Sequence, residues 1–387
     1  MIAVLVTVLW AGQGCERVDH SGDFPASDAA QVALEDVALI LSDLPLGSPQ
    51  MKEVHDAVGS SSGNGYDEEY MMRDLFSTPG AGVGDDVTKA ATKAYDNPLK
   101  DMISEYVRTH TTKASDLSPE DFLSALQRSD IQIYWPGWEK WDGEALPVIT
   151  FDPGDGSSRN TGYHLLPDGS VDEIIVDEQM ASELPVWVVN RNDDSAYTSL
   201  ELLRRQDPSW GSGGGEIIVG PTKASSAPLR TLLLKDFKAN RNYDSWFAGA
   251  SEFFVKVGAV EDFVASTEAE LKLYSPSITD FMIVVKRSEV GTVKPFNAIL
   301  VSQWSEQLGT CAFMITEDDG GTITSWKCSA EVKIKSKSYG IDISIPFNSR
   351  DDIVWRGQLS SKFFEKNSSR TGRFGDVSLT FEIEELP

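Results

Sequence analysis

Apolar positions in the first third of the chain recur three and four residues apart, which is the period of an amphipathic helix. A capping residue followed by proline is typical of a helix start, and this pair occurs three times in the same region. We therefore expect residues 26–128 to form a helical region. The pairs stand at residues 48–49, 97–98 and 118–119.

From residue 131 onward the period of the apolar positions falls to two, which is typical of strands. The runs L-P-V-I-T-F-D, V-D-E-I-I-V-D and L-P-V-W-V-V-N are short and are separated by the turn sequences P-G-D-G and P-D-G. Residues 131–205 are therefore expected to form a small β-rich unit. The stretch 206–228, with G-S-G-G-G and A-S-S-A-P, has the composition of a linker.

Short strands recur from residue 229 to the end without long helices between them, which favours an antiparallel β-sandwich at 229–387. The sequence thus predicts an α+β, multidomain protein. Its parts in order are the N-terminal helical region, the small β-rich unit and the C-terminal antiparallel β-sandwich.

The clearest hairpin pattern is C-A-F-M-I-T-E-D-D-G-G-T-I-T-S-W-K-C. A two-residue turn at 319–320 would place Cys311 opposite Cys328, where facing side chains come closest. This register predicts a disulfide between Cys311 and Cys328, and the alternative is two reduced thiols packed in the core. A second hairpin is expected at 332–345, turning at 339–340.

The start of the chain has the features of an export signal. Residues 2–11 are apolar, too few to span a bilayer, and small residues precede Cys15. We expect a signal peptide at 1–14, lipidation of Cys15 and a polar tether at 15–25. The unusual Gln13 and the lack of a basic residue before the apolar run leave open an ordinary cleaved signal, or a start further upstream.

The net charge of −26 changes what partners are expected. Nearly all of the acidic excess lies in residues 1–220, and such a surface repels phosphate backbones. We therefore expect no nucleic-acid partner. A solvated surface explains the charge, and the alternatives are divalent cations or a cationic partner.

The stretch N-R-N-D-D-S-A-Y-T-S-L-E fits the spacing of a calcium loop, because calcium takes oxygen ligands gathered around a tight turn. Asn stands at the first position, and Ser195 stands where the template has glycine. The alternative is that Thr198 to Glu201 form a capping box for a following helix. The expected ligands are Asn190, Asn192, Asp194 and Glu201.

Two other acidic loops give a second candidate calcium site. Glu317, Asp318 and Asp319 lie at the tip of the predicted hairpin, and Asp351 and Asp352 lie in another loop. Both loops could bind calcium jointly if they project from one end of the sandwich. The alternative is that they are ordinary acidic turns.

Three tryptophans, Trp135, Trp138 and Trp141, stand close together in W-P-G-W-E-K-W-D-G. They could form a stacking surface for a sugar or peptide, and the alternative is that they close a small core. Sequence signatures of enzymes are mostly absent, and there are only four histidines. A hydrolase that uses two carboxylates leaves no local pattern, so that class stays open.

Several segments are shared with a known group of proteins. They are the apolar start with Cys15 and Y-D-E-E-Y, W-P-G-W-E-K-W-D-G, P-V-W-V-V-N-R-N-D-D-S, N-Y-D-S-W-F-A-G-A-S-E-F-F-V and M-I-T-E-D-D-G-G. In these segments the chain resembles a family of uncharacterised exported lipoproteins of Bacteroidetes-type bacteria. The resemblance implies an envelope location, on the outer membrane or cell surface or otherwise in the periplasm, and a sandwich comparable in architecture to C2-type domains. It assigns no catalytic residue.

The functional hypothesis from the sequence is a lipid-anchored protein of the cell envelope that binds a glycan, peptide or protein ligand. Calcium is its candidate cofactor, and no other cofactor is expected. Binding is favoured over catalysis. The alternatives are an envelope hydrolase using acidic residues and a structural envelope component.

Overall fold

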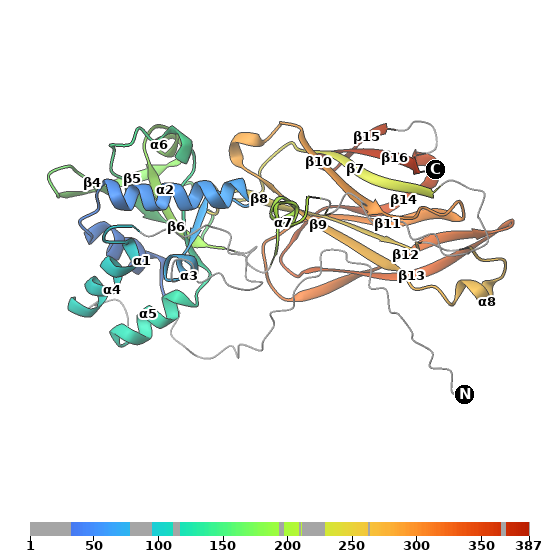
Figure 1. The fold of residues 1–387 in the computed structure, drawn as a ribbon, viewed down its shortest axis with the longest axis horizontal. Coiled ribbons are helices and arrows are strands. Elements are labelled where there is room, and N and C mark those ends of the chain that lie inside the picture. Colours follow the sequence, from blue (N-terminus) through green and yellow to red (C-terminus); the bar gives the residue numbers. More distant parts are fainter. Residues whose placement is uncertain are drawn as a thin grey trace.

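The chain folds into an N-terminal α/β part and a C-terminal two-sheet part, which confirms the α+β, multidomain prediction (Figure 1). No helix in the described residues is long and apolar enough to cross a membrane. The computed structural model describes residues 32–77, 95–110, 117–192, 197–208, 210, 229–261, 264–364 and 369–386. Cys15, the expected signal peptide and tether, Asp194 and most of the expected linker lie outside these residues.

The N-terminal part is built on a six-stranded sheet in the order β1-β2-β6-β3-β4-β5. Neighbouring strands are antiparallel except for β3 and β6, which are parallel. The strands are β1 (Glu69–Met71), β2 (Ile131–Tyr134), β3 (Val148–Phe151), β4 (Arg159–Leu165), β5 (Val171–Asp177) and β6 (Val186–Arg191).

Helices cover one face of this sheet, with α1 packed on β3 and β6 and α2 on β1. Their apolar stripes share one core with Ile133, Ile149 and Trp187 of the strands. The expected helical region and the expected β-rich unit therefore fold together around a common core. The helices are α1 (Leu34–Asp43), α2 (Ser48–Gly63), α3 (Met72–Leu75), α4 (Leu99–Thr109), α5 (Pro119–Gln127), η1 (Trp138–Lys140), α6 (Glu178–Glu183) and α7 (Leu200–Gln206).

The C-terminal part has two antiparallel sheets that enclose the largest core of the protein. One sheet has the order β10-β7-β16-β15, and the other has the order β13-β12-β11-β8-β9 with β14 also paired to β11. Contacts such as Phe237 with Phe253 and Phe313 with Phe381 join the two sheets, with ring centroids 5.2 and 5.7 Å apart. This is the sandwich that the period-two pattern predicts.

The strands of the sandwich are β7 (Leu229–Ala239), β8 (Ser251–Ala259), β9 (Ser277–Val285), β10 (Lys294–Val301), β11 (Leu308–Glu317), β12 (Ile323–Ile334), β13 (Lys337–Asn348), β14 (Asp352–Ser360), β15 (Ser369–Phe374) and β16 (Val377–Leu386). The short helices between them are α8 (Glu268–Leu271), η2 (Arg287–Glu289) and α9 (Ser361–Phe364).

The predicted hairpin at 311–328 is wrong. Only the start of β11 pairs with β12, through Glu331 and Val332 near the end of β12, and the rest of β11 lies between β8 and β14. Cys311 therefore faces Leu359, Cys328 faces Ile343, and both are free thiols rather than the expected face-to-face pair. A strand from later in the chain competes for the same edge of β11, and a local pattern cannot reveal that competition.

The second hairpin exists, but its turn is earlier than expected. Strands β12 and β13 pair along their whole length around Lys335, whose φ is 57°. Gly340 lies opposite Glu331 within the ladder, so the prediction of a turn at 339–340 is wrong. The earlier turn lets Ile343 and Ile345 continue one buried face of β13.

Candidate metal centre at the domain junction

The connection between β7 and β8, residues 240–250, joins the two parts of the molecule, and we call it the junction loop. Trp246 and Phe247 of this loop are 4% and 0% exposed. They pack against Val186 and Val188 of β6, on the sheet face opposite α1 and α2. Strand β6 is therefore covered on both faces, which explains why V-W-V-V has no polar position.

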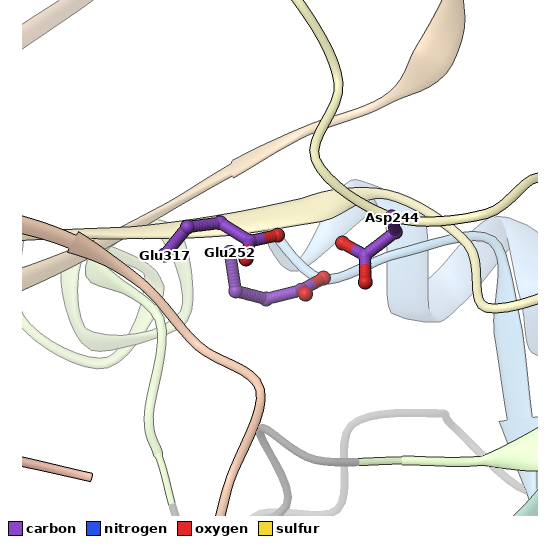
Figure 2. A group of neighbouring side chains, drawn as sticks. All are labelled: Asp244, Glu252 and Glu317. Carbon is purple, nitrogen blue, oxygen red and sulfur yellow. The ribbon is translucent and has the colours of Figure 1, made fainter. Parts of the chain in front are cut away.

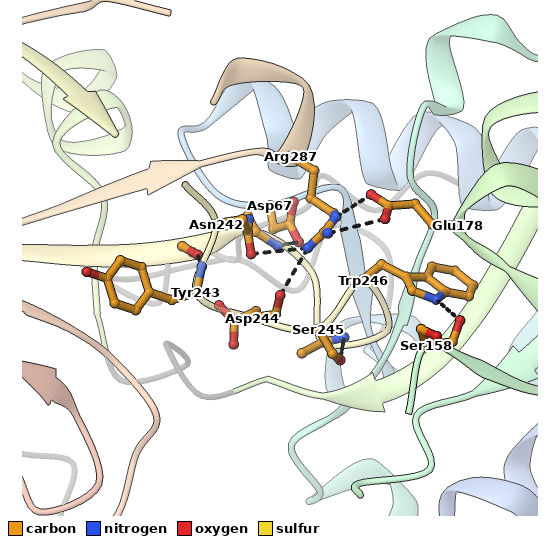
Figure 3. A network of polar contacts seen from close by, with 12 residues as sticks. Asp67, Ser158, Glu178, Asn242, Tyr243, Asp244, Ser245, Trp246 and Arg287 are labelled. Carbon is orange, nitrogen blue, oxygen red and sulfur yellow. Dashed lines mark hydrogen bonds and ion pairs between the residues drawn. The ribbon is translucent and has the colours of Figure 1, made fainter. Parts of the chain in front are cut away.

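Hydrogen bonds fix the backbone of the junction loop. Asn190 Nδ2 donates to the carbonyl oxygens of Phe247 and Ala248, at 2.9 and 2.7 Å. Trp246 Nε1 donates to the carbonyl oxygen of Ser158 at 3.0 Å (Figure 3). Because Asn190 and Ser158, the partners of the loop in these bonds, belong to the N-terminal part, docking of the two parts decides where the loop lies.

Arg287 holds the same loop from another side. Its Nη1 donates to Asn242 Oδ1 and to the carbonyl oxygen of Asp244, both at 3.1 Å. Its Nε forms an ion pair with Glu178 Oε1 at 2.7 Å (Figure 3). The backbone of Asp244 is thus held by an arginine that also binds the N-terminal part.

Three carboxylates meet at this junction, and we call them the junction carboxylates: Asp244, Glu252 and Glu317. They come from the junction loop, the start of β8 and the end of β11. One oxygen of each lies within 4.8 Å of the other two, and the side chains point toward one another (Figure 2). Glu317 is 0% exposed, Glu252 is 6% exposed and Asp244 is half-buried.

The electrostatics of this group are unfavourable in the absence of a cation. Within the described residues, no N–H donates to either carboxylate oxygen of Glu317 or to Asp244 Oδ2, and the hydroxyl side chain beside both acids is that of Ser251. Burial raises the pKa of Glu317, and the neighbouring Asp244 carboxyl raises it further. Burial also raises the pKa of Asp244. A retained proton or a bound cation would relieve this repulsion.

The structure also brings together the acidic loops that the sequence singled out. Asn348 bridges them, because its Nδ2 donates to Asp318 Oδ1 at 2.8 Å and its backbone N–H donates to Asp351 Oδ2 at 2.9 Å. Asp352 lies opposite Glu317 in the pairing of β14 with β11. Burial raises the pKa of Asp351 to about 7, and the adjacent Asp318 carboxyl contributes. Burial and the Asp352 charge also raise the pKa of Asp319.

The described residues of the other expected calcium loop make contacts of their own, and Asp194 lies outside the described residues. Asn190 lies in β6 and binds the junction loop, and Asn192 Nδ2 donates to Glu69 Oε2 at 2.7 Å. Glu201 lies exposed in the first turn of α7. Ser199, rather than Thr198, caps this helix, because its Oγ accepts from the Leu202 N–H at 3.0 Å.

The three tryptophans surround His55 on α2. Trp135 is 1% exposed, and Trp138 covers Gly59, where an added Cβ would lie 2.7 Å from the indole ring. Trp141 Nε1 donates to the carbonyl oxygen of Ala145 at 2.9 Å. All three rings thus help to close the N-terminal core, and Trp135 and Trp141 also line a surface cavity of about 140 Å³.

Sequence reasoning missed Asp244 and Glu252. Both stand in N-Y-D-S-W-F-A-G-A-S-E-F-F-V, which the sequence marked only as a family-like segment. An acid directly before the apolar run F-F-V was the available signal, since such strand positions are usually buried. Their approach to Glu317 depends on contacts between distant segments.

No protein-family model and no curated protein matches this chain. Matches to solved structures include that of Drosophila C2-DSL-EGF1, which is 11% identical and covers 41% of this chain and 68% of that chain. The TM-score is 0.19, so this likeness carries no argument about fold or function.

Proposed function

We propose that this protein is a binding protein of the cell envelope whose C-terminal sandwich holds a divalent cation of the calcium type at the junction carboxylates. The observation that carries the proposal is Glu317. It is fully buried beside two other carboxylates, and in the described part of the chain no N–H donates to either of its oxygens.

Calcium fits this donor set because it is a hard cation that takes six to eight oxygen ligands in flexible geometry. The junction carboxylates supply oxygens only, and zinc and copper favour nitrogen or sulfur ligands. A bound cation would replace the mutual repulsion of buried carboxylates by attraction. It would also connect the junction loop to β8 and β11, and thereby stabilise the docking of the two parts.

The test is a melting curve of the full chain in EDTA, then in millimolar calcium or magnesium. Calcium should raise the melting temperature by mass action. Glu317→Gln and Asp244→Asn should each abolish most of this increase, and Asp342→Asn, an exposed acid on β13, should leave it unchanged. Terbium luminescence that calcium displaces gives a second readout if one variant folds poorly. No calcium shift and no displaceable terbium in the parent protein would overturn the proposal.

The proposed location at the envelope is supported by the apolar residues 2–11 and by Cys15. Expressed in a bacterial host with radiolabelled palmitate, the parent chain should incorporate label and fractionate with membranes. Cys15→Ala should lose the label and become soluble in the periplasm. A parent chain that stays unlabelled in the cytoplasm would contradict both export and lipidation.

An envelope hydrolase is the second candidate function, and the carboxyl pair of Asp318 and Asp351 favours it. Two adjacent carboxyls can divide the roles of acid and base in bond hydrolysis. Chromogenic glycosides and peptides would be the substrates to try. Activity lost in both Asp318→Asn and Asp351→Asn, but kept in Asp342→Asn, would establish catalysis at this pair.

A further inference from the structure

A cavity of about 160 Å³ lies on the face of β8 and β9 that is turned away from the sandwich core, and we call it the side pocket. Its residues come from β8, β9, the residue after β11, the end of β13 with the following turn and, across the domain junction, the N-terminal part. They are Tyr197, Phe254, Lys256, Ile278, Asp280, Asp318, Pro346, Phe347, Asn348 and Asp351.

The polar groups of the side pocket carry an excess of negative charge, with three aspartates and one lysine. Lys256 Nζ is already paired with Asp280 Oδ2 at 2.8 Å, and the Tyr197 hydroxyl donates to the same oxygen at 2.7 Å. The lysine is therefore neutralised, and the charge left over belongs to Asp318 and Asp351.

Two carboxylate oxygens of the side pocket are buried without a donor. Among the described residues, no N–H or O–H donates to Oδ1 of Asp280 or to Oδ1 of Asp351. Asp351 is only 9% exposed, and its Oδ2 is used by the Asn348 N–H. A buried acceptor without a donor raises the free energy of the folded protein. A ligand that donates hydrogen bonds to these oxygens therefore gains more binding free energy than it would from the same bonds in water.

Apolar groups form the rest of the wall. The rings of Tyr197 and Phe254 lie 4.4 Å apart between centroids, and Phe347, Pro346 and Ile278 complete the lining. Aromatic faces attract cations and also bury aliphatic chains. A bare metal ion would gain nothing from these walls, whereas an organic cation would use both kinds of surface.

We propose that the side pocket binds an organic cation, namely a primary ammonium or guanidinium group on a short aliphatic chain. Its N–H donors would face Asp351 and Asp318, and its chain would lie against Phe347 and Pro346. The ring of Phe254 is already in contact with Lys256 Nζ, which lies 4.7 Å from its centroid. The same chemistry occurs in free diamines and in the lysine or arginine side chain of a partner protein. One ammonium or guanidinium group with a short chain is of the size that a cavity of about 160 Å³ accommodates.

The test is isothermal titration calorimetry of the full chain in EDTA, which removes divalent cations. The probes are cadaverine, agmatine and the blocked tripeptide acetyl-Gly-Arg-Gly-amide, with glutarate and 1-pentanol as anionic and neutral controls. The amines should bind and the controls should not. Asp351→Asn should weaken binding by about ten-fold or more, since a hydrogen bond between charged groups is lost. Asp342→Asn makes the same charge change on an exposed site and should not alter binding.

Ile278→Lys tests the side pocket without touching an acid. Ile278 is 36% exposed, so the added ammonium group can occupy the site while the fold is kept, and binding of the probes should be lost. Val293→Lys, at a position 55% exposed and outside the pocket, should bind as the parent does. Preference for free amines or for the peptide would identify the source of the ligand.

The side pocket and the junction carboxylates give separable results. Glu317→Gln should lose the calcium-dependent rise in melting temperature and keep amine binding. Asp351→Asn should keep the calcium-dependent rise and weaken amine binding. If no amine binds the parent chain, or if Asp351→Asn and Ile278→Lys both bind as the parent does, the proposal for the side pocket is overturned.

Discussion

The Cα atom of Gly249 lies against the carboxylate of Asp67, and an added Cβ would stand 2.5 Å from Asp67 Oδ2. The φ of Gly249 is 123°, a conformation that side chains other than glycine rarely adopt. The same Asp67 oxygen accepts the Ala250 N–H at 3.0 Å. This close approach joins the N-terminal part to the junction loop.

Gly249→Ala should destabilise the protein by at least about 1–3 kcal/mol, the usual cost of backbone strain of this kind, and should also displace Asp67. Urea unfolding followed by circular dichroism measures the loss. Gly169→Ala is the matched control, because its φ is 83° and nothing lies near the added Cβ. If Gly249→Ala lowers the free energy of unfolding no more than Gly169→Ala does, the close contact with Asp67 contributes nothing to stability.

Trp246→Ala should cost about 3–5 kcal/mol, as for other large buried aromatic residues, because it empties the space between the junction loop and β6. The sandwich keeps its own core, so calorimetry should show two separate unfolding transitions in place of a coupled one. Leu273→Ala, at a position 82% exposed, should change stability by less than about 0.5 kcal/mol. An unchanged single transition in Trp246→Ala would show that the loop does not couple the two parts.

Glu68 should make stability depend on pH. Burial raises its pKa from 4.5 to about 8, with Asp67 and Glu139 adding and Lys286 opposing. The folded chain then keeps a proton that the unfolded chain has released, so this contribution to stability is present below pH 4.5 and is lost as pH rises to about 8.

Glu68→Gln removes this titration and should lose less stability than the parent between pH 5 and pH 8.5. The midpoints of urea unfolding at the two pH values measure this change in stability for each protein. The other acids titrate in both proteins and therefore do not affect the difference between them. Glu183→Gln, an exposed acid, serves as the control. Equal pH dependence of Glu68→Gln and the parent would contradict the raised pKa.

The two thiols should differ in reactivity. Cys311 is 0% exposed, burial raises its pKa to about 12, and only the thiolate reacts. Cys328 is half-buried, and burial raises its pKa as well. A disulfide-exchange reagent should modify Cys328 slowly in the native protein and Cys311 only after unfolding. A linked Cys311–Cys328 peptide in non-reducing maps would contradict the pairing of β11 with β14.

The candidate site was partly visible in the sequence. The acid-rich turns at 318–319 and 351–352 drew attention to the end of the sandwich where the candidate site lies, because clustered acids are a local property. Asp244 and Glu252 stand singly in an aromatic segment, and only the docking of the junction loop brings Asp244 toward Glu317. The burial of Glu317 likewise depends on its strand neighbours β8 and β14.

The sequence by itself determined the fold class, the helical start and the strands of the sandwich, because periodicity and helix caps act within a few residues. The tertiary structure alone decided strand partners. Strand β14 lies beside β11 where the local pattern predicted β12, and the junction loop covers β6. These choices depend on which distant surfaces bury the most apolar area together, and that comparison is made only when the whole chain has folded.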